Sequence, residues 1–544
     1  MLVNFVKKLA KKKIKTSEDF LNWKKKLVAE FKIAPPGNVE ILEIYKKLRQ
    51  QKKITANSFF EKQLKKRPVR SLSGVAVISV LTKPWPCPGR CLYCPLEQGI
   101  PKSYLSGEPA VERAKLLKYD PYQQVKKRIE ALERIGHPTD KIELIVIGGT
   151  WSYLPKQYQS WFIKRCFEAA NADRRKLKHR STQMISVNLR PAKRNLRQSA
   201  LSEAQKINEK AKHRIVGLTL ETRPDYITPK EIKRMRKLGC TRVEIGVQAI
   251  DDRILRINKR GHDVKTIVQA TKLLKEAGFK VCYHMMPGLP GSSPDKDFEM
   301  FKELFSNPDY QPDMLKIYPC VVTKGSELYK LWKKGEYKPY TDKQLVNLLV
   351  KIKSIVPPYV RIIRVIRDIP SPKIEGGSKI SNLREVVQKE MKKRGLKCQC
   401  IRCREIKDIR LKIKNLRLIC REYEASGGKE VFLSYEDIKN DKLIAFLRLR
   451  LPQISKDSLL KYFPQLKGAA LIRELHTYGE LVPIGQKRKA AQHLGFGKKL
   501  MREAEKITQK NGYKKIAVIA GVGVREYYRK LGYRLENTYM VKNF

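Results

Sequence analysis

The sequence is poor in acidic residues. Its 544 residues include 54 Asp and Glu against 116 Lys and Arg, which gives a formal net charge of +62. Solubility does not require such an excess of positive charge, so the imbalance indicates a partner that is a polyanion. Nucleic acid is the first candidate for this partner, and an anionic membrane surface is the second.

Long apolar runs are also missing. No uninterrupted apolar stretch approaches the roughly 18 residues of a transmembrane helix, so we expect none. The residues after Met1 lack the apolar centre of a secretory signal. The 11 cysteines are odd in number and clustered in short spacings typical of metal sites. This pattern favours metal binding in a reducing cytoplasm over disulfide formation.

The chain is too long for a single core, and we expect several domains. The first region, residues 1–70, repeats lysine clusters among apolar positions, which predicts short helices with a basic outer face. One such face would be an ordinary solvated surface, but five clusters favour contacts with nucleic-acid phosphates. The clusters are Lys7-Lys8, Lys11-Lys12-Lys13, Lys24-Lys25-Lys26, Lys52-Lys53 and Lys65-Lys66-Arg67.

Residues 71–365 alternate short apolar runs with helical patterns. This alternation predicts an α/β fold with a parallel sheet and right-handed crossovers. Six strand–helix units predict an incomplete barrel, in which ligands would bind at the carboxyl ends of the strands. The candidate strands are 74–82, 142–148, 214–220, 241–247, 279–285 and 313–319. The helical patterns lie at 110–135, 156–172, 229–238, 264–277 and 295–305.

Three cysteines, Cys87, Cys91 and Cys94, directly follow the first candidate strand. Three thiolates on one loop can hold three irons of a [4Fe–4S] cluster and leave the fourth iron open for a small molecule. A zinc knuckle is the alternative, but a structural zinc site takes four protein ligands, and the next histidine is His137. The spacing therefore favours an iron–sulfur cluster at the carboxyl end of the strand.

Other notable residues lie at the ends of the later strands. Gly148 and Gly149 end the second strand, where bare backbone can approach a ligand closely. Glu221 ends the third strand and Gln248 ends the fourth. Lys316 lies within the sixth strand, where a lone lysine is costly unless it meets an anion or a substrate. These positions predict a ligand pocket beside the cysteine loop.

The linker of residues 366–420 contains a second group of three cysteines, Cys398, Cys400 and Cys403. Three local thiolates predict a structural zinc site, whose fourth ligand must come from elsewhere in the chain. Cys320 is the preferred fourth ligand, because it would join the barrel to the linker, and Cys420 is the other candidate. A second iron–sulfur cluster is the rival interpretation.

Residues 421–544 have a different pattern, which predicts an α+β domain. Strand patterns near 430–435, 443–450 and 469–478 precede a glycine-rich turn and a helix at 497–510. A strand ending at Gly523 and a helix containing Tyr527 and Tyr528 follow. The turn would present bare N–H groups and the positive end of a helix dipole to a phosphate. Its residues are Gln492, His493, Leu494, Gly495, Phe496 and Gly497.

These motifs resemble known families. The cysteine spacing, with an aromatic residue before the last cysteine, resembles the radical S-adenosylmethionine (radical SAM) enzymes, and the glycine turn resembles the pyrophosphate loop of GNAT acetyltransferases. The ordered strings resemble the family of the catalytic third subunit of Elongator, whose free-standing archaeal members are tRNA wobble-uridine acetyltransferases. These strings include Lys102-Ser-Tyr-Leu-Ser-Gly-Glu-Pro109, Leu218-Thr-Leu-Glu-Thr-Arg-Pro-Asp-Tyr226, Gly239-Cys-Thr-Arg-Val-Glu-Ile-Gly-Val-Gln248 and Asn258-Lys-Arg-Gly-His262.

The resemblance implies a fold and a set of site residues. The fold would be a partial (β/α)6 radical SAM barrel at 71–365, a zinc-binding linker and an α+β GNAT domain, preceded by the basic helical region. The cluster ligands would be Cys87, Cys91 and Cys94, and the SAM pocket would contain Gly148, Gly149, Glu221 and Gln248. Lys316 would meet the substrate or the acetyl group. Acetyl-CoA would be held by 492–497, Tyr527 and Tyr528, with Glu474 and His476 of the third strand assigned to the same site.

The resemblance also implies an activity. Binding of a tRNA anticodon stem-loop would license hydrolysis of acetyl-CoA. A SAM-derived 5′-deoxyadenosyl radical would then take hydrogen from the acetyl methyl group, and that carbon would add to carbon-5 of the wobble uridine. Unpaired loop bases are the part of RNA that proteins reach most easily. We expect a cytoplasmic enzyme that acts as a monomer or a homodimer, without a membrane partner.

Two other functions fit parts of the sequence. A protein-lysine acetyltransferase could use the iron–sulfur domain only as a scaffold, and its general base would be Glu474, next to His476. A non-catalytic RNA-binding assembly subunit would also satisfy the basic charge. Two intact cofactor motifs argue against this last function.

Overall fold

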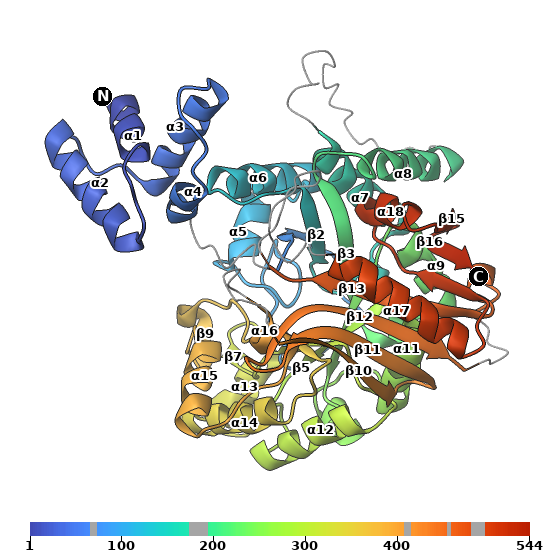
Figure 1. Cartoon of the computed structure of the whole chain (residues 1–544). Helices are drawn as coiled ribbons and strands as arrows, with labels where there is room; N and C mark the ends of the chain where they lie inside the picture. The colour runs from blue at the N-terminus through green and yellow to red at the C-terminus, as the bar shows by residue number, and fades with distance from the viewer. Residues whose placement is uncertain (66–72, 173–193, 407–414, 454–458, 480–494) are drawn as a thin grey trace.

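The structure, a computed structural model, describes residues 1–65, 73–172, 194–406, 415–453, 459–479 and 495–544. The described chain has three parts: four N-terminal helices, a curled parallel sheet covered by helices, and a mixed C-terminal sheet (Figure 1).

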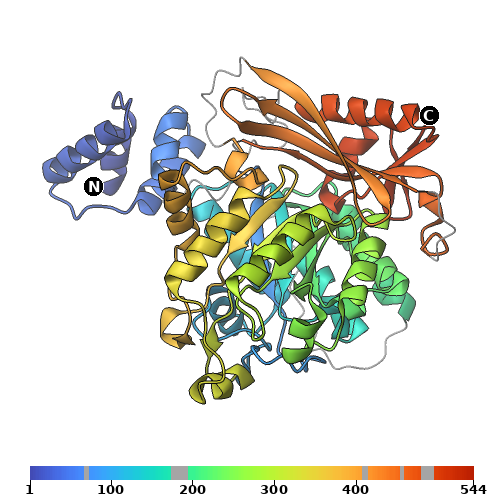
Figure 2. The same cartoon turned by 90° about the horizontal axis from the view of Figure 1, so that it is seen from below.

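The N-terminal helices form a small unit with a hydrophobic core of its own. Phe5, Leu27, Tyr45 and Phe60 are buried in this core. The unit projects from the rest of the molecule (Figures 1 and 2) and meets it through an ion pair of 2.6 Å between Glu43 and Arg134. Its helices are α1 (Leu2–Ala10), α2 (Ser17–Phe31), α3 (Asn38–Gln50) and α4 (Ser58–Leu64).

The central sheet is parallel throughout, and its strands are neighbours in chain order. Its strands are β1 (Ala76–Leu81), β2 (Lys141–Ile147), β3 (Arg214–Thr222), β4 (Arg242–Gln248), β5 (Lys280–Met285), β6 (Met314–Ile317) and β8 (Arg361–Val365). The expected α/β class and partial barrel are confirmed. The sheet has a seventh strand, β8, that the sequence prediction lacks, because two of its five residues are arginines and its apolar pattern is short.

Helices connect and cover these strands. They are α5 (Pro109–Leu116), α6 (Pro121–Arg134), α7 (Lys156–Asn171), α8 (Arg194–Asn208), α9 (Pro229–Lys237), α10 (Asp252–Ile257), α11 (Val264–Glu276), α12 (Pro294–Ser306), α13 (Glu327–Lys333) and α14 (Asp342–Ser354). The helical pattern at 110–135 forms two helices rather than one. Pro121 lies in the first turn of α6, a position that proline tolerates, whereas it cannot continue a preceding helix.

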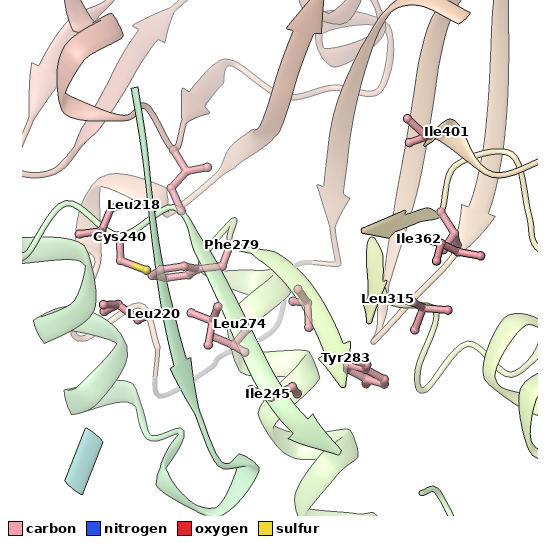
Figure 3. Packing of buried hydrophobic residues seen from close by; sticks show 14 of the residues in the cluster. Leu218, Leu220, Cys240, Ile245, Leu274, Phe279, Tyr283, Leu315, Ile362 and Ile401 are labelled. Carbon is pink, nitrogen blue, oxygen red and sulfur yellow. The ribbon is translucent and has the colours of Figure 1, made fainter. Parts of the chain in front are cut away.

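The two faces of the barrel sheet differ in chemistry. One face packs apolar side chains against the helices, and Figure 3 shows Leu218, Leu220 and Ile245 of the strands together with Leu274 of α11. The opposite face carries charged residues. Because side chains alternate between faces along a strand, the charged residues of neighbouring strands meet, as Glu244 of β4 does with Lys316 of β6.

The linker after the barrel contains α15 (Leu383–Lys393), α16 (Ile401–Arg404) and β9 (Ile374–Gly376), which pairs with β7 (Val322–Thr323) from the segment after β6. The C-terminal sheet follows, in the order β10-β11-β12-β13-β14-β16-β15. Its strands are β10 (Leu416–Glu424), β11 (Gly428–Asp437), β12 (Lys442–Pro452), β13 (Ala469–Thr477), β14 (Lys515–Val518), β15 (Arg534–Glu536) and β16 (Tyr539–Asn543). Helices α17 (Phe496–Lys510) and α18 (Arg525–Arg529) pack with this sheet.

The C-terminal sheet packs against the barrel (Figure 2), and its contacts lie at the amino ends of the barrel strands. Arg473 of β13 donates to the carbonyl of Phe279, one residue before β5, at 2.6 Å. Arg361, the first residue of β8, donates to the hydroxyl of Tyr478 at 2.6 Å. A Cβ atom on Gly521 would lie 2.0 Å from the carbonyl oxygen of Val216, so only glycine permits this approach.

Candidate functional site

The cysteine loop lies at the carboxyl end of β1, as expected. Cys91 is buried, and Cys87 and Cys94 are partly exposed. A hydrogen bond with Cys94 and the nearby charge of Arg260 outweigh burial and lower the pKa of the Cys91 thiol to about 4. Because the thiolate is the form that binds metal, Cys91 is prepared to act as a ligand.

The loop is braced by segments that are distant in the sequence. The Lys102 ammonium donates to the Gly89 carbonyl at 2.7 Å, and the Leu92 amide donates to the Asn258 carbonyl at 3.3 Å. Cys87 lies 3.9 Å from the Thr150 hydroxyl, in the turn that follows β2. The loop therefore touches the predicted glycine turn directly.

The glycine turn has a backbone that other residues rarely adopt. Gly148 and Gly149 have φ values of 131° and 95°. A Cβ atom on Gly148 would lie 2.1 Å from the Thr82 hydroxyl, at the carboxyl end of β1. The turn thus brings bare backbone close to the cysteine loop, as a ligand pocket requires.

Glu221 and Gln248 lie at the carboxyl ends of the neighbouring strands β3 and β4. Gln248 has a left-handed φ of 72°, and its side-chain oxygen is buried without a hydrogen-bond partner among the described residues. Such strained, unsatisfied groups are concentrated at functional sites. Glu221 accepts a hydrogen bond of 3.1 Å from Tyr104, in the segment that follows the cysteine loop. Both residues fit a ligand pocket.

Lys316 lies inside the barrel, and its charge already has a partner. Its ammonium forms an ion pair with Glu244, which is fully buried and also accepts from His284 at 2.9 Å. Arg242 lies 3.6 Å from the same carboxylate. The structure therefore places Lys316 in a charged network, so a direct contact with the substrate or the acetyl group would require this pair to open.

The three cysteines of the linker also lie close together in the structure. The Sγ atoms of Cys398, Cys400 and Cys403 lie within 4.8 Å of one another. The Lys353 ammonium lies 3.6 Å from the Cys403 sulfur, and hydrogen bonds with the other two cysteines lower the pKa of the Cys403 thiol. Three thiolates at this distance fit a zinc ion.

The structure does not bring Cys320 to this group. The hydroxyl of Tyr337 interacts with its thiol, and burial raises the pKa of Cys320 to about 12. The backbone amide of Cys320 donates a hydrogen bond to the carbonyl of Pro287, and the Cys320 side chain belongs to the main hydrophobic core. Cys420, the other candidate, is exposed on β10. Among the described residues, neither Cys320 nor Cys420 lies in the group formed by Cys398, Cys400 and Cys403, and the fourth ligand stays a prediction.

The predicted acetyl-CoA site lies where two parallel strands separate. β13 pairs with β14 only over Ala469–Ile472, and β13 continues to Thr477 without that neighbour. Helix α17 begins after Gly495, whose φ is 77°. A Cβ atom on Gly497 would lie 3.0 Å from the Tyr527 hydroxyl, so the glycine turn and α18 meet. Gln492, His493 and Leu494 lie outside the described residues.

The remaining predicted residues of this site face elsewhere. Tyr528 is buried against Tyr533 in the core of the domain. The carboxylate of Glu474 accepts from Arg448 at 3.0 Å and lies 3.7 Å from Lys280 of the barrel. His476 makes a 2.8 Å hydrogen bond with the carbonyl of Ser73. Glu474 and His476 therefore join the C-terminal sheet to the barrel.

These contacts bear on the predicted general base. Burial raises the pKa of Glu474, but the charges of Lys280 and Arg448 outweigh it and hold the pKa at about 2. A general base works best with a pKa near the working pH. Glu474 is poorly suited to take a proton from a lysine substrate.

Several residues near the cysteine loop have no role in the sequence prediction. Arg260 donates to the Cys91 sulfur at 3.1 Å, and Arg223 donates to the Arg260 carbonyl at 2.7 Å. Burial and these two cations lower the pKa of His262 to about 3, so its imidazole is neutral. All three residues lie in strings quoted above, Arg223 in 218–226 and Arg260 and His262 in 258–262, but a string assigns no role by itself.

No helix in the described part of the chain is long and apolar enough to cross a membrane.

Two protein-family models match the part of the chain that contains the cysteine loop and the barrel. The Radical SAM superfamily model matches residues 87–305, and the Radical_SAM C-terminal domain model matches residues 312–393.

Curated relatives cover most of the chain. The tRNA uridine(34) acetyltransferase of Methanocaldococcus jannaschii is 48% identical over 94% of this chain and 91% of its own length. Elongator complex protein 3 of Homo sapiens is 42% identical over 88% of this chain and 86% of its own length. The solved structure of the archaeal Methanocaldococcus infernus Elp3 with an N-terminal deletion (1–46) has 46% identity and a TM-score of 0.71, and covers 87% of this chain and 100% of that chain. The chain therefore belongs to the Radical SAM superfamily and, within it, to the family of tRNA uridine(34) acetyltransferases and Elongator complex protein 3.

Proposed function

We propose that this protein modifies the wobble uridine of tRNA by adding a carboxymethyl-type group derived from acetyl-CoA. The observation that carries this proposal is the joint presence of the cysteine loop and a separated strand pair in a chain 48% identical to a tRNA uridine(34) acetyltransferase. The alternative of protein-lysine acetylation lacks support from Glu474, whose carboxylate is tied up in ion pairs.

The residues at the carboxyl ends of the barrel strands fit the cofactors that the Radical SAM family implies. Cys87, Cys91 and Cys94 would hold a [4Fe–4S] cluster, and the Gly148 turn and Gln248 would line the SAM pocket. The unpaired oxygen of Gln248 and the close approach at Gly148 support this fit. When bound, the cluster and SAM would supply a carbon radical able to remove a hydrogen atom from an acetyl methyl group.

The residues of the C-terminal domain would hold acetyl-CoA. Among the described residues no side chain caps the amino end of α17, which would bind a phosphate, and Tyr527 lies beside it. Burial raises the pKa of Tyr527 to about 12, so its hydroxyl would stay protonated and donate a hydrogen bond. In the linker, Cys398, Cys400 and Cys403 would bind zinc, together with a fourth ligand from elsewhere.

Two features support tRNA as the substrate. The N-terminal helices project from the barrel and carry basic residues in the last turns of α1 and α3. A cavity of about 230 Å³ lies at β1, and Arg113 and Arg128 are among the residues that line it. Basic side chains of this kind contact phosphates without reading sequence. A tRNA substrate also agrees with the expected cytoplasmic location.

The decisive experiment measures acetyl-CoA hydrolysis and the modified nucleoside together. Purified, anaerobically reconstituted protein is incubated with acetyl-CoA, SAM and a reductant, with and without tRNA. We expect hydrolysis to rise only with tRNA, and carboxymethyl-type uridine to appear by mass spectrometry of the digested RNA. Transfer of acetyl groups to lysines, with no response to tRNA, would contradict the proposal.

Replacing a cluster cysteine provides the matched test of the radical step. Cys91→Ser should abolish nucleoside formation, at least a hundredfold, because a ligand of the cluster is lost. It should leave tRNA-dependent hydrolysis of acetyl-CoA largely intact, because that site lies in another domain. Cys420→Ser changes an exposed cysteine on β10 and should retain both activities. Equal loss of nucleoside formation in Cys91→Ser and Cys420→Ser would show that cysteine replacement disturbs the protein generally.

Replacing Gly148 by alanine tests the SAM pocket. The new Cβ atom would collide with Thr82 at a φ of 131°, and such strain costs about 1–3 kcal/mol. We expect SAM to bind about tenfold more weakly in isothermal titration calorimetry. Gly335→Ala is the control, since Gly335 has a φ of 77° and no heavy atom would lie within 4 Å of a Cβ atom added there. If Gly148→Ala binds SAM with wild-type affinity, the turn does not form part of the SAM pocket.

A further inference from the structure

Arg260 makes an unusual contact with the cysteine loop. One guanidinium nitrogen lies 3.1 Å from the Cys91 sulfur, and another donates to the carbonyl of Gly246 in β4. The side chain reaches the loop from the segment after α10, which also holds the backbone of Leu92. Arg260 is therefore fixed against a predicted cluster ligand from two directions.

The charge of Arg260 has no carboxylate partner. The residue is 4% exposed, and among the described residues no Asp or Glu forms an ion pair with it. An isolated buried charge is expensive unless an opposite charge lies nearby. The negative charge next to this guanidinium is the thiolate loop itself. The position of Arg260 thus makes sense when an anionic group occupies the loop.

Arg223 is a useful contrast. It lies beside the same loop, and a Cβ atom on Gly89 would be 2.4 Å from one of its nitrogens. However, its guanidinium is already paired with Asp225 at 2.9 Å. The charge of Arg223 is therefore largely offset, whereas that of Arg260 is not.

We propose that Arg260 is a positioning residue that raises the reduction potential of the iron–sulfur cluster through its bond to Cys91. The inference rests on the proposed cluster. Reduction by an external one-electron donor adds one negative charge to the thiolate-bound cluster. A hydrogen bond to a ligand sulfur and a nearby fixed cation both stabilise the reduced form, and both are known to tune such potentials.

The test is a redox titration of the full-length, anaerobically reconstituted protein. Dithionite is the reductant, and the electron paramagnetic resonance signal of the reduced cluster is the readout. In Arg260→Gln we expect the ratio of reduced to oxidised cluster at a fixed potential to fall at least tenfold. For a one-electron couple this corresponds to a downward shift of 59 mV. Arg260→Lys keeps the charge but loses the planar fork, so its shift should be smaller and still downward.

Two controls separate this effect from general disturbance. Arg256→Gln alters an exposed arginine on α10 and should leave the potential unchanged. Arg223→Gln should shift it less than Arg260→Gln, because Asp225 already offsets that charge. Iron content and circular dichroism are measured for every variant, so that cluster loss is distinguished from a change in potential.

Each outcome decides the proposal. A wild-type potential in Arg260→Gln with full iron content overturns it. If Arg260→Gln loses iron, Arg260→Lys decides: a retained cluster with a lowered potential supports the proposal, and a retained cluster with an unchanged potential overturns it. Loss of iron from both folded variants shows that Arg260 only shapes the loop, which also overturns it. Wild-type protein that takes up no iron would count against the proposed cofactor instead.

Discussion

Replacing Asp313 by alanine is expected to destabilise the protein by about 3–5 kcal/mol, the cost of breaking a buried ion pair. Asp313 lies just before β6 and is fully buried. Its carboxylate accepts from Arg473 at 2.8 Å and from the Val281 amide at 2.8 Å, and lies 3.5 Å from Arg448. The variant would leave two buried guanidinium groups without this partner, at the contact between barrel and C-terminal sheet.

Urea unfolding followed by circular dichroism and by tryptophan fluorescence measures this loss. We also expect the single transition of the wild type to separate into two, because both arginines come from the C-terminal sheet and Asp313 from the barrel. Asp295→Ala is the control, since its side chain is 91% exposed. A midpoint shift in Asp313→Ala no larger than in this control would refute the role of Asp313.

The same carboxylate predicts a pH dependence. The charges of Arg473 and Arg448 outweigh burial and hold the pKa of Asp313 well below its usual value. Its stabilising contribution is therefore complete above the unfolded pKa of about 3.9 and is lost as the pH falls toward the folded pKa. Asp313→Asn should unfold with a flatter acid dependence than the wild type in thermal scans below about pH 5.

The second large effect concerns Lys316 and Glu244 inside the barrel. Lys316→Met should destabilise the protein by about 3 kcal/mol, because it leaves the Glu244 carboxylate buried without its ammonium partner. Arg242 and His284 still contact that carboxylate, which places the loss at the lower end of the range. Adding Glu244→Gln removes the stranded charge and should recover part of the stability.

A double-mutant cycle in urea measures this coupling. The two single variants and the combined variant should give an interaction free energy of about 1–3 kcal/mol. Lys353→Met serves as a comparison, because it removes another buried lysine that contacts cysteine rather than a carboxylate. If the losses of unfolding free energy in the two single variants are additive, the ion pair contributes no interaction free energy. The contact would then only position Lys316.

The sequence predicts the parts of the molecule that local patterns determine. The six predicted barrel strands occur within two residues of their expected ends, because buried parallel strands are nearly continuous apolar runs. The cysteine loop and the Gly148 turn follow from those strands, since they lie at strand ends. β10, by contrast, begins at Leu416, before the predicted start of the domain, because a mostly exposed edge strand has little apolar signal.

Long-range contacts are the part that the sequence does not reveal. Arg260 and Cys91 are 169 residues apart, and only closure of the sheet brings them together. Glu474 has the residue type of a general base, but its neighbours Arg448 and Lys280 come from other strands and suppress that role. Cys320 is predicted as the fourth zinc ligand from its position after β6, whereas in the structure its thiol interacts with the hydroxyl of Tyr337. Residue type and spacing do not contain this information.

The barrel separates the cysteine loop from the face on which the C-terminal sheet docks. The cysteine loop follows the carboxyl end of β1, and the C-terminal sheet contacts the amino ends of the strands. Six residues of strand span about 20 Å. A nucleic-acid strand advances about 3.4 Å per nucleotide, so about six nucleotides bridge that distance. A loop of RNA is therefore long enough to span the barrel from end to end, whereas a single lysine side chain is not.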